Sequence, residues 1–254
     1  LEYKKIIRQL ASHAQSELGK SLIMELKPFT EQSTVEKKLD ETDQAETLIA
    51  HIGSSPMDSF PDITTALKKA AVGSVLSPGE LLQIAHVLKV ALKVKEAINK
   101  YPQKDKIPLI VEQAVQLKAH KHLMEEILRC IETEEHISDN ASPQLASIRR
   151  SIQRTHGKIR DRLNSLIHSP QFQKYLQEPI ITIRNNRYVV PVKQEYKGNV
   201  PGMIHDQSSS GATLFIEPMP VVEANNELRE LFIKEQKEIE KILADLTNKV
   251  QSVN

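Results

Sequence analysis

Residues 179–198 read PIITIRNNRYVVPVKQEYKG, and their apolar and polar side chains alternate as they do in a β-strand. We predict two strands, at residues 180–183 and 187–192. The turn between them falls on Asn185 and Asn186, because asparagine tolerates the positive φ of a tight hairpin turn. Two more short strands are expected at residues 202–204 and 212–216. The pattern predicts a small β module inside an otherwise helical chain.

Two long helical patterns flank this module. Apolar residues recur every three or four positions through residues 143–168, which predicts one helix of about 39 Å at about 1.5 Å per residue. The same spacing runs through residues 221–254 at Val221, Asn225, Leu228, Phe232, Glu235, Ile239, Ile242, Leu246 and Val253. Matching stripes on two long helices are typical of an antiparallel coiled coil.

The first half of the chain predicts a bundle of shorter helices. Helical spacing is found in residues 1–19, 33–49, 62–73, 77–101 and 109–131. Ser33 with Glu36, and Ser77 with Glu80, fit the capping box that begins a helix. The break at residues 132–141 has room for a short β-hairpin.

The predicted fold class is mainly α. Its parts are a helical core (1–141), an ascending lever helix (142–170), a small β clamp (171–218) and a descending lever helix (219–254). The chain has only eight glycines, and 4% of its residues are aromatic. Both low contents agree with a helical chain. Both ends of the sequence lie inside helical patterns, so we expect it to be part of a longer protein.

The overall composition excludes several classes of protein. Lys and Arg number 34 against 33 Asp and Glu, so net charge alone indicates no partner. A single cysteine, Cys130, forms no internal disulfide and favours the cytoplasm. No apolar run approaches the roughly 20 residues of a membrane span, and no membrane partner is expected.

Local charge gives the candidate binding residues. The helix at residues 143–168 holds six bases against one acid. Its Arg149, Arg150 and Arg154 can pair with the acidic returning helix, and those left on the outer face can meet phosphate; both can hold, because six bases exceed what one helix pair needs. The β module adds four cations that could rest on a nucleic-acid backbone, namely Arg184, Arg187, Lys193 and Lys197.

Residues 200–218, VPGMIHDQSSSGATLFIEP, contain the residue types of a hydrolase but not its arrangement. No G-x-S-x-G motif occurs, and His205 and Asp206 are neighbours whose side chains diverge on a strand. No P-loop motif is present. We expect no catalytic residue, metal or cofactor in this chain. His205 remains a candidate phosphate contact beside a glycine-containing turn.

The run RYVVPVKQEYKGNVPGMIHDQSSSGATLFIEPMPVVEANNELREL (187–231) resembles the clamp and descending arm of the bacterial MutS-like family, in the branch that lacks the mismatch-recognition domain. LEYKKIIRQLASHAQSELGK (1–20) and ISDNASPQLASIRRSI (137–152) resemble the start of its core and its ascending arm. Together these segments span nearly the whole chain.

The resemblance implies a full-length homodimer with an ABC-type ATPase domain, which uses ATP and Mg²⁺, and a C-terminal Smr endonuclease domain, both outside these residues. It implies binding to branched or duplex DNA with suppression of recombination, or binding to ribosomal RNA on stalled ribosomes. Two hypotheses follow for this chain: a clamp that contacts nucleic acid directly, or a purely structural lever whose nucleic-acid contacts lie in the other domains.

Overall fold

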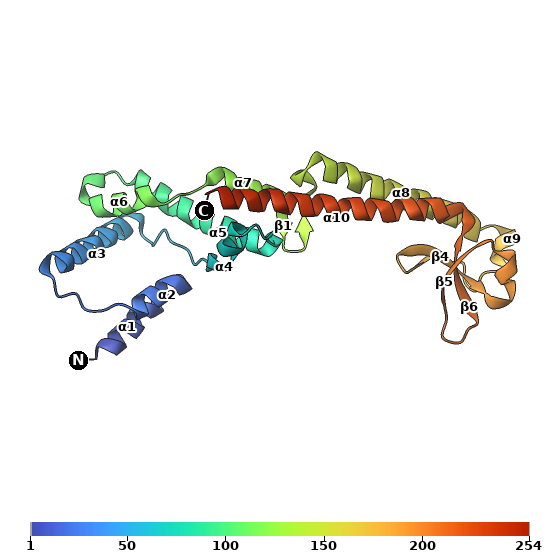
Figure 1. Ribbon diagram of the computed structural model, residues 1–254, viewed down its shortest axis with the longest axis horizontal. Helices are drawn as coiled ribbons and strands as arrows, with labels where there is room; N and C mark the ends of the chain where they lie inside the picture. Colours follow the sequence, from blue (N-terminus) through green and yellow to red (C-terminus); the bar gives the residue numbers. More distant parts are fainter. Residues whose placement is uncertain (1, 254) are drawn as a thin grey trace. The chain divides into compact units, whose positions relative to one another are not determined.

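The computed structural model describes residues 2–253, which are mainly helical with two small antiparallel sheets. They form two compact units. The sheet unit is Ser142–Lys241, and the helix unit is the rest of the described chain. Helix α10 (Met219–Val253) contributes its first part to the sheet unit and its last part to the helix unit. Each unit has its own set of elements (Figure 1).

The helix unit contains α1 (Tyr3–Ser12), α2 (Glu17–Met24), α3 (Gln32–Ile52), α4 (Thr64–Ala71), α5 (Pro78–Lys100), η1 (Lys104–Lys106), α6 (Pro108–Gln116), α7 (Lys121–Cys130), β1 (Ile131–Thr133), β2 (His136–Ile137) and η2 (Asp139–Ala141). The sheet unit contains α8 (Pro143–Ile167), α9 (Pro170–Gln173), β3 (Thr182–Arg184), β4 (Arg187–Lys193), η3 (Gln194–Asn199), β5 (Gly202–Gln207) and β6 (Thr213–Pro218). The η elements are short 3₁₀ turns.

One of the two predicted capping boxes is confirmed, the one at Ser77. At the start of α5 the Ser77 hydroxyl accepts from the Glu80 amide at 3.2 Å, and the Glu80 carboxylate accepts from the Ser77 amide at 2.9 Å. Both halves of the predicted capping box are therefore present. The hairpin expected at residues 132–141 is also present, as β1 and β2, although its first strand begins at Ile131.

Two predicted helices are each divided in two. The pattern over residues 1–19 is broken between α1 and α2, where the Ser16 hydroxyl accepts from the Gly19 amide and begins a new helix. The pattern over residues 109–131 is broken after α6, where Leu117 is extended. The Leu117 carbonyl accepts from Lys95 Nζ at 2.9 Å, a contact with α5 that sequence spacing does not reveal.

The capping box predicted at Ser33 is wrong. Helix α3 begins one residue earlier, with Glu31 at the cap position, and Glu31 accepts from the Ser33 and Thr34 hydroxyls. These hydrogen bonds lower the pKa of the Glu31 carboxyl from its usual value, and the one from Thr34 has the larger effect.

The sheet unit holds one four-stranded antiparallel sheet in the order β3-β4-β6-β5. Asn185 and Asn186 have φ of 51° and 59°, which confirms the predicted tight turn. Arg184 faces Arg187 across that turn. Strands β4 and β5 begin at their predicted residues, and the other strand limits differ from the predicted ones by one to three residues.

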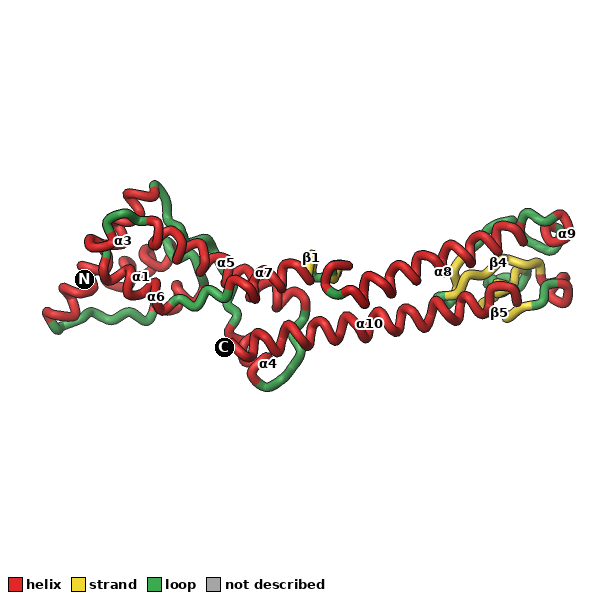
Figure 2. Tube along the Cα trace, turned by 90° about the horizontal axis from the view of Figure 1, so that it is seen from above, coloured by secondary structure: helices red, strands yellow, loops and turns green. Residues whose placement is uncertain are grey.

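Helix α8 lies beside the first part of α10 in both views (Figures 1 and 2). The two helices are antiparallel, because Ser142 bonds to Glu238 while Arg162 bonds to the Pro220 carbonyl. Their apolar stripes and one face of the sheet share a core, whose buried members include Ile152, Ile159, Leu163, Val190, Val192, Ile216 and Leu228. That this pair forms a coiled coil and acts as a lever remains a prediction.

Gly202 lies where strand β5 passes closest to β6. A Cβ atom at this position would lie 2.2 Å from the Glu217 carbonyl oxygen and 2.7 Å from Ile216 Cγ2. Only glycine therefore fits here without moving the strand backbone. By contrast, a Cβ on Gly198 or Gly157 would meet no atom within 4 Å.

We predict that Gly202→Ala lowers the free energy of unfolding by about 2 kcal/mol or more, because the clash is with backbone. Gly198→Ala is the matched control and should change it by less than about 0.5 kcal/mol. Gly157→Ala should raise it by up to about 1 kcal/mol, since alanine is the better helix former in α8. Urea unfolding followed by circular dichroism tests all three, and equal effects at 198 and 202 would contradict the close approach.

Candidate nucleic-acid interface

Charge is distributed unevenly between the two units. The sheet unit carries 15 Lys and Arg against 11 Asp and Glu, whereas the remainder of the sequence carries 19 against 22. The near-zero charge of the whole chain therefore hides a basic unit and an acidic one. The basic unit is the one that contains all eight predicted contact residues.

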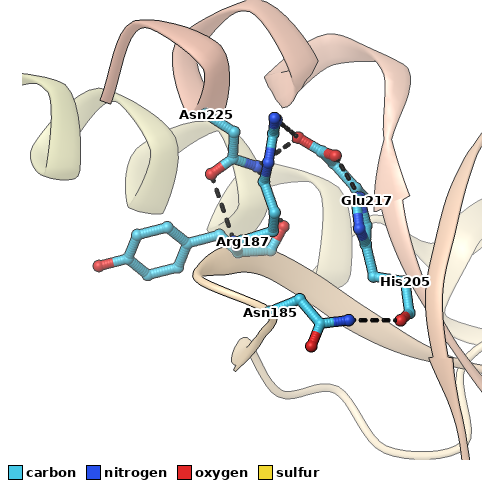
Figure 3. A network of polar contacts seen from close by, with 6 residues as sticks. Asn185, Arg187, His205, Glu217 and Asn225 are labelled. Carbon is cyan, nitrogen blue, oxygen red and sulfur yellow. Dashed lines mark hydrogen bonds and ion pairs between the residues drawn. The ribbon is translucent and has the colours of Figure 1, made fainter. Parts of the chain in front are cut away.

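Glu217 is the centre of a buried polar network in the sheet unit (Figure 3). Its side chain is 0% exposed and accepts from Arg187 Nη1 at 3.0 Å and from Asn225 Nδ2 at 2.7 Å. His205 Nε2 lies 2.5 Å from the other carboxylate oxygen. Asn225 also bonds to the backbone of Tyr188 through both ends of its amide. The network joins β4, β5, β6 and α10.

Three of the predicted contact residues are therefore engaged within the unit. The Arg187 and His205 side chains are 12% and 19% exposed and point toward Glu217. Arg149 pairs with Glu235 of α10 at 2.7 Å, and both side chains are about four-fifths buried. Contact of these residues with nucleic acid stays a prediction, while the structure gives each of them an internal partner.

Arg184 is more accessible but is held in place. Its side chain is 39% exposed, pairs with Asp206 at 3.3 Å, and stacks on the ring of Phe215 at 4.2 Å from the ring centre. The hairpin turn beside it does not project freely, because Asn185 and Asn186 line a groove together with Leu228 of α10. The turn therefore lies beside α10.

Lys193 lies at the other end of β4, about 20 Å from Arg187 at about 3.3 Å per residue. At this end of the strand, Lys193 Nζ donates to the Lys174 carbonyl and lies 5.9 Å from the centre of the Tyr196 ring. Lys174 in turn lies over Tyr175, whose ring contacts Tyr196. We call Lys174, Lys193 and Lys197, with the two tyrosines, the lysine patch.

The structure thus separates the four cations predicted on the β module into two places. It also adds Lys174, Tyr175 and Tyr196, which sequence reasoning missed. The available signal was the interleaving of lysine and tyrosine in residues 174–175 and 193–197.

Arg150 and Arg154 are exposed and belong to a regular series on α8. With Lys158 they are spaced four residues apart, which places all three on one face of the helix. None of the three forms an ion pair with another residue among 2–253. We call Arg150, Arg154 and Lys158 the α8 stripe.

Residues 202–207 and 213–218 form strands β5 and β6, and the three serines lie in the turn between these strands. The Ser208 hydroxyl accepts from the Thr213 amide and contacts the Ser210 hydroxyl, while His205 is turned to Glu217. Within residues 2–253, no three His, Cys, Asp or Glu side chains gather as metal ligands would. None of the helices described here has the length and apolar character needed to span a membrane.

Comparison with known proteins places close relatives along the whole chain. The chain is 47% identical over 247 residues to a protein named Endonuclease MutS2 from Ruminiclostridium cellulolyticum, covering 97% of this chain and 31% of the relative. It is 48% identical over 254 residues to Endonuclease MutS2 of Acetivibrio thermocellus, covering 100% and 32%. Putative endonuclease MutS2 of Bacillus subtilis is 42% identical over 250 residues, covering 98% and 32%.

The chain spans about a third of the length of the curated relatives it matches. No protein-family model matches it.

We predict that Glu217→Gln destabilises the protein by about 3 kcal/mol, because it leaves the Arg187 charge buried without its countercharge. The matched control is Asp206→Asn, which removes a carboxylate from the half-exposed Arg184 pair and should cost less than about 1 kcal/mol. Chemical denaturation measures both. Equal small losses would mean that Glu217 does not organise the sheet unit.

Proposed function

We propose that this chain, which belongs to the MutS2 family of MutS-like proteins, binds the phosphate backbone of nucleic acid. The sheet unit of the chain would make the contact. The observation that carries the proposal is the lysine patch, where Lys174 and Lys193 lie over two touching tyrosine rings and Lys197 directly follows Tyr196 in the chain. Ammonium groups attract phosphate, and aromatic rings next to them stack on bases or sugars without reading sequence.

The α8 stripe supports the same function on a second surface. Like charges four residues apart on a helix cost about 0.2–0.5 kcal/mol per pair. Arg150, Arg154 and Lys158 accept this cost without an acidic partner among the described residues. Such an arrangement is favourable when an external anion lies along the helix, and a phosphate backbone is a regular row of anions.

In the full-length protein, we propose that the antiparallel pair of α8 and α10 is a lever and that the four-stranded sheet is the clamp at its end. An ATPase of the ABC type, using ATP and Mg²⁺, and an endonuclease domain would occupy the length that this chain does not cover. The intact protein would act as a homodimer in the cytoplasm. This chain itself would hold the substrate and would not cut it.

The natural target would be branched or duplex DNA, with suppression of recombination, or ribosomal RNA on a stalled ribosome. Both offer phosphate at regular spacing, so both suit the same cations. Neither the lysine patch nor the α8 stripe has a side-chain pair arranged to read bases. Their contribution would therefore be affinity without sequence preference.

The second candidate function is a purely structural lever whose nucleic-acid contacts lie in other domains. It is favoured by the internal pairing of Arg187 with Glu217 and of Arg149 with Glu235. Those two pairs stabilise the sheet unit whether or not it binds anything. The two functions differ in what they expect of the lysine patch: a clamp loses affinity for nucleic acid when these lysines are replaced, and a purely structural lever does not.

We predict that replacing Lys174, Lys193 and Lys197 together by glutamate weakens binding of a 30-base-pair duplex about tenfold or more. The slope of log K against log salt should fall in magnitude by about 2–3, because each lost phosphate contact removes about 0.9. Fluorescence anisotropy at several salt concentrations measures both quantities.

The control replaces Lys4, Lys37 and Lys100, three exposed lysines of the helix unit, by glutamate. It makes the same change in net charge and should leave the slope nearly unchanged. If both triple variants behave alike, the lysine patch is not the contact surface. A chain that binds no duplex or structured RNA even at low salt would favour the structural lever.

A further inference from the structure

We propose that the groove between the β3–β4 turn and α10 receives a single unstacked base of a nucleic-acid strand. The groove has a volume of about 720 Å³ and lies wholly within the sheet unit. Sites for small organic ligands measure about 300–1,000 Å³, so a nucleotide-sized group fits. The inference rests on the proposed function and deepens it, because it specifies which kind of nucleic acid the sheet unit prefers.

The stacking surface is supplied by α10. Arg229, Phe232, Ile233 and Gln236 line the groove at the three- and four-residue spacing of one helix face. Phe232 is 43% exposed and Ile233 is 49% exposed, although both are large apolar side chains. An aromatic ring left open to solvent beside an arginine is the arrangement on which unpaired bases stack.

The far wall of the groove holds His156 of α8. Its ring meets Phe232 edge to face at 6.0 Å, and its Nδ1 bonds to the Tyr188 hydroxyl at 2.7 Å. Burial lowers the pKa of the His156 imidazole, and the nearby charge of Arg160 lowers it further. The Phe232 ring therefore has a hydrogen-bonded aromatic neighbour on α8.

The polar groups around the ring suit the edge of a base. Asn186, at the hairpin turn, is exposed and held at φ of 59° by the turn itself. Gln236 lies on the α10 side of the groove. Each side-chain amide has both donors and an acceptor, which is what the mixed edges of bases require.

The charge of the groove also suits a nucleic-acid strand. No acidic residue of the described chain lines it, while Arg229 does, and Arg229 forms no ion pair with another residue among 2–253. Arg187 also lines the groove but is neutralised by Glu217. A free guanidinium at the rim can bind the phosphate that precedes or follows the inserted base.

The test uses two 2-aminopurine probes of equal length, one fully paired and one carrying 2-aminopurine as a single-base bulge. We expect Phe232→Ala to weaken binding of the bulged probe by about 5- to 150-fold, the range for loss of one base stacking contact. Binding of the paired probe should change by less than about twofold. The change in 2-aminopurine fluorescence on binding the bulged probe should be lost as well.

Two further variants separate stacking from simple loss of apolar area. Phe232→Tyr keeps the ring and should bind the bulged probe as the unaltered chain does. Ile233→Ala removes a side chain of similar exposure in the same groove and should have a much smaller effect than Phe232→Ala. Circular dichroism checks that all three variants keep their helix content, as expected for exposed positions.

The outcomes distinguish this proposal from the proposed function. If the chain binds both probes equally and Phe232→Ala changes neither, the groove is not a base site, although the backbone contact stands. If no probe binds at low salt, both proposals fail. If Phe232→Ala instead abolishes self-association in sedimentation, with no effect on either probe, the groove is an interface between copies of the chain and the base site is overturned.

Discussion

The buried carboxylate of Glu217 determines how the sheet unit is put together. A carboxylate removed from water loses several kcal/mol of hydration, which must be offset by donors and a countercharge. Arg187, His205 and Asn225 supply them, from β4, β5 and α10 respectively. Because Asn225 also holds the backbone of Tyr188, the same network ties the β3–β4 hairpin to α10. The groove beside that hairpin therefore lies between two elements that this network joins.

This constraint divides the cations of the sheet unit into two groups. Arg187 cannot reach a phosphate without leaving Glu217 uncompensated, and Arg149 would likewise leave Glu235. These arginines stabilise the fold. The cations of the lysine patch and the α8 stripe form no ion pair among residues 2–253. Phosphate can therefore bind them without breaking an internal ion pair. A count of basic residues in the sequence cannot make this distinction, because it depends on whether each one meets a carboxylate from another element of the folded unit.

The sequence was sufficient at two places where the interacting groups are near neighbours, although the equally local capping box at Ser33 was wrong. The Ser77–Glu80 capping box and the Asn185–Asn186 turn each involve four residues or fewer, so their geometry follows from local chemistry alone. The break at Leu117 was missed because its carbonyl is held by Lys95, 22 residues away.

The role of Glu217 was missed for the same reason. Before Pro218 it resembles the entrance to a helix, yet its partners His205 and Arg187 lie 12 and 30 residues earlier. The apolar stripe of residues 221–254 also includes Phe232, which predicts that its ring is buried between the two long helices. The ring instead lines the groove beside the β3–β4 hairpin and is 43% exposed.

The exposed ring of Phe232 gives the sheet unit a property that its cations cannot provide, namely a response to unpaired bases. Phosphate contacts bind every duplex about equally and weaken together as salt is raised. A preference for branched or distorted nucleic acid must come from a group that responds to unpaired bases, and stacking on an aromatic ring responds to them because a paired base is already stacked. Phe232, supported by His156 and flanked by Arg229, meets that requirement within the sheet unit. Affinity and selectivity would then reside in separate surfaces, and the network of Glu217 would hold the selective one in place.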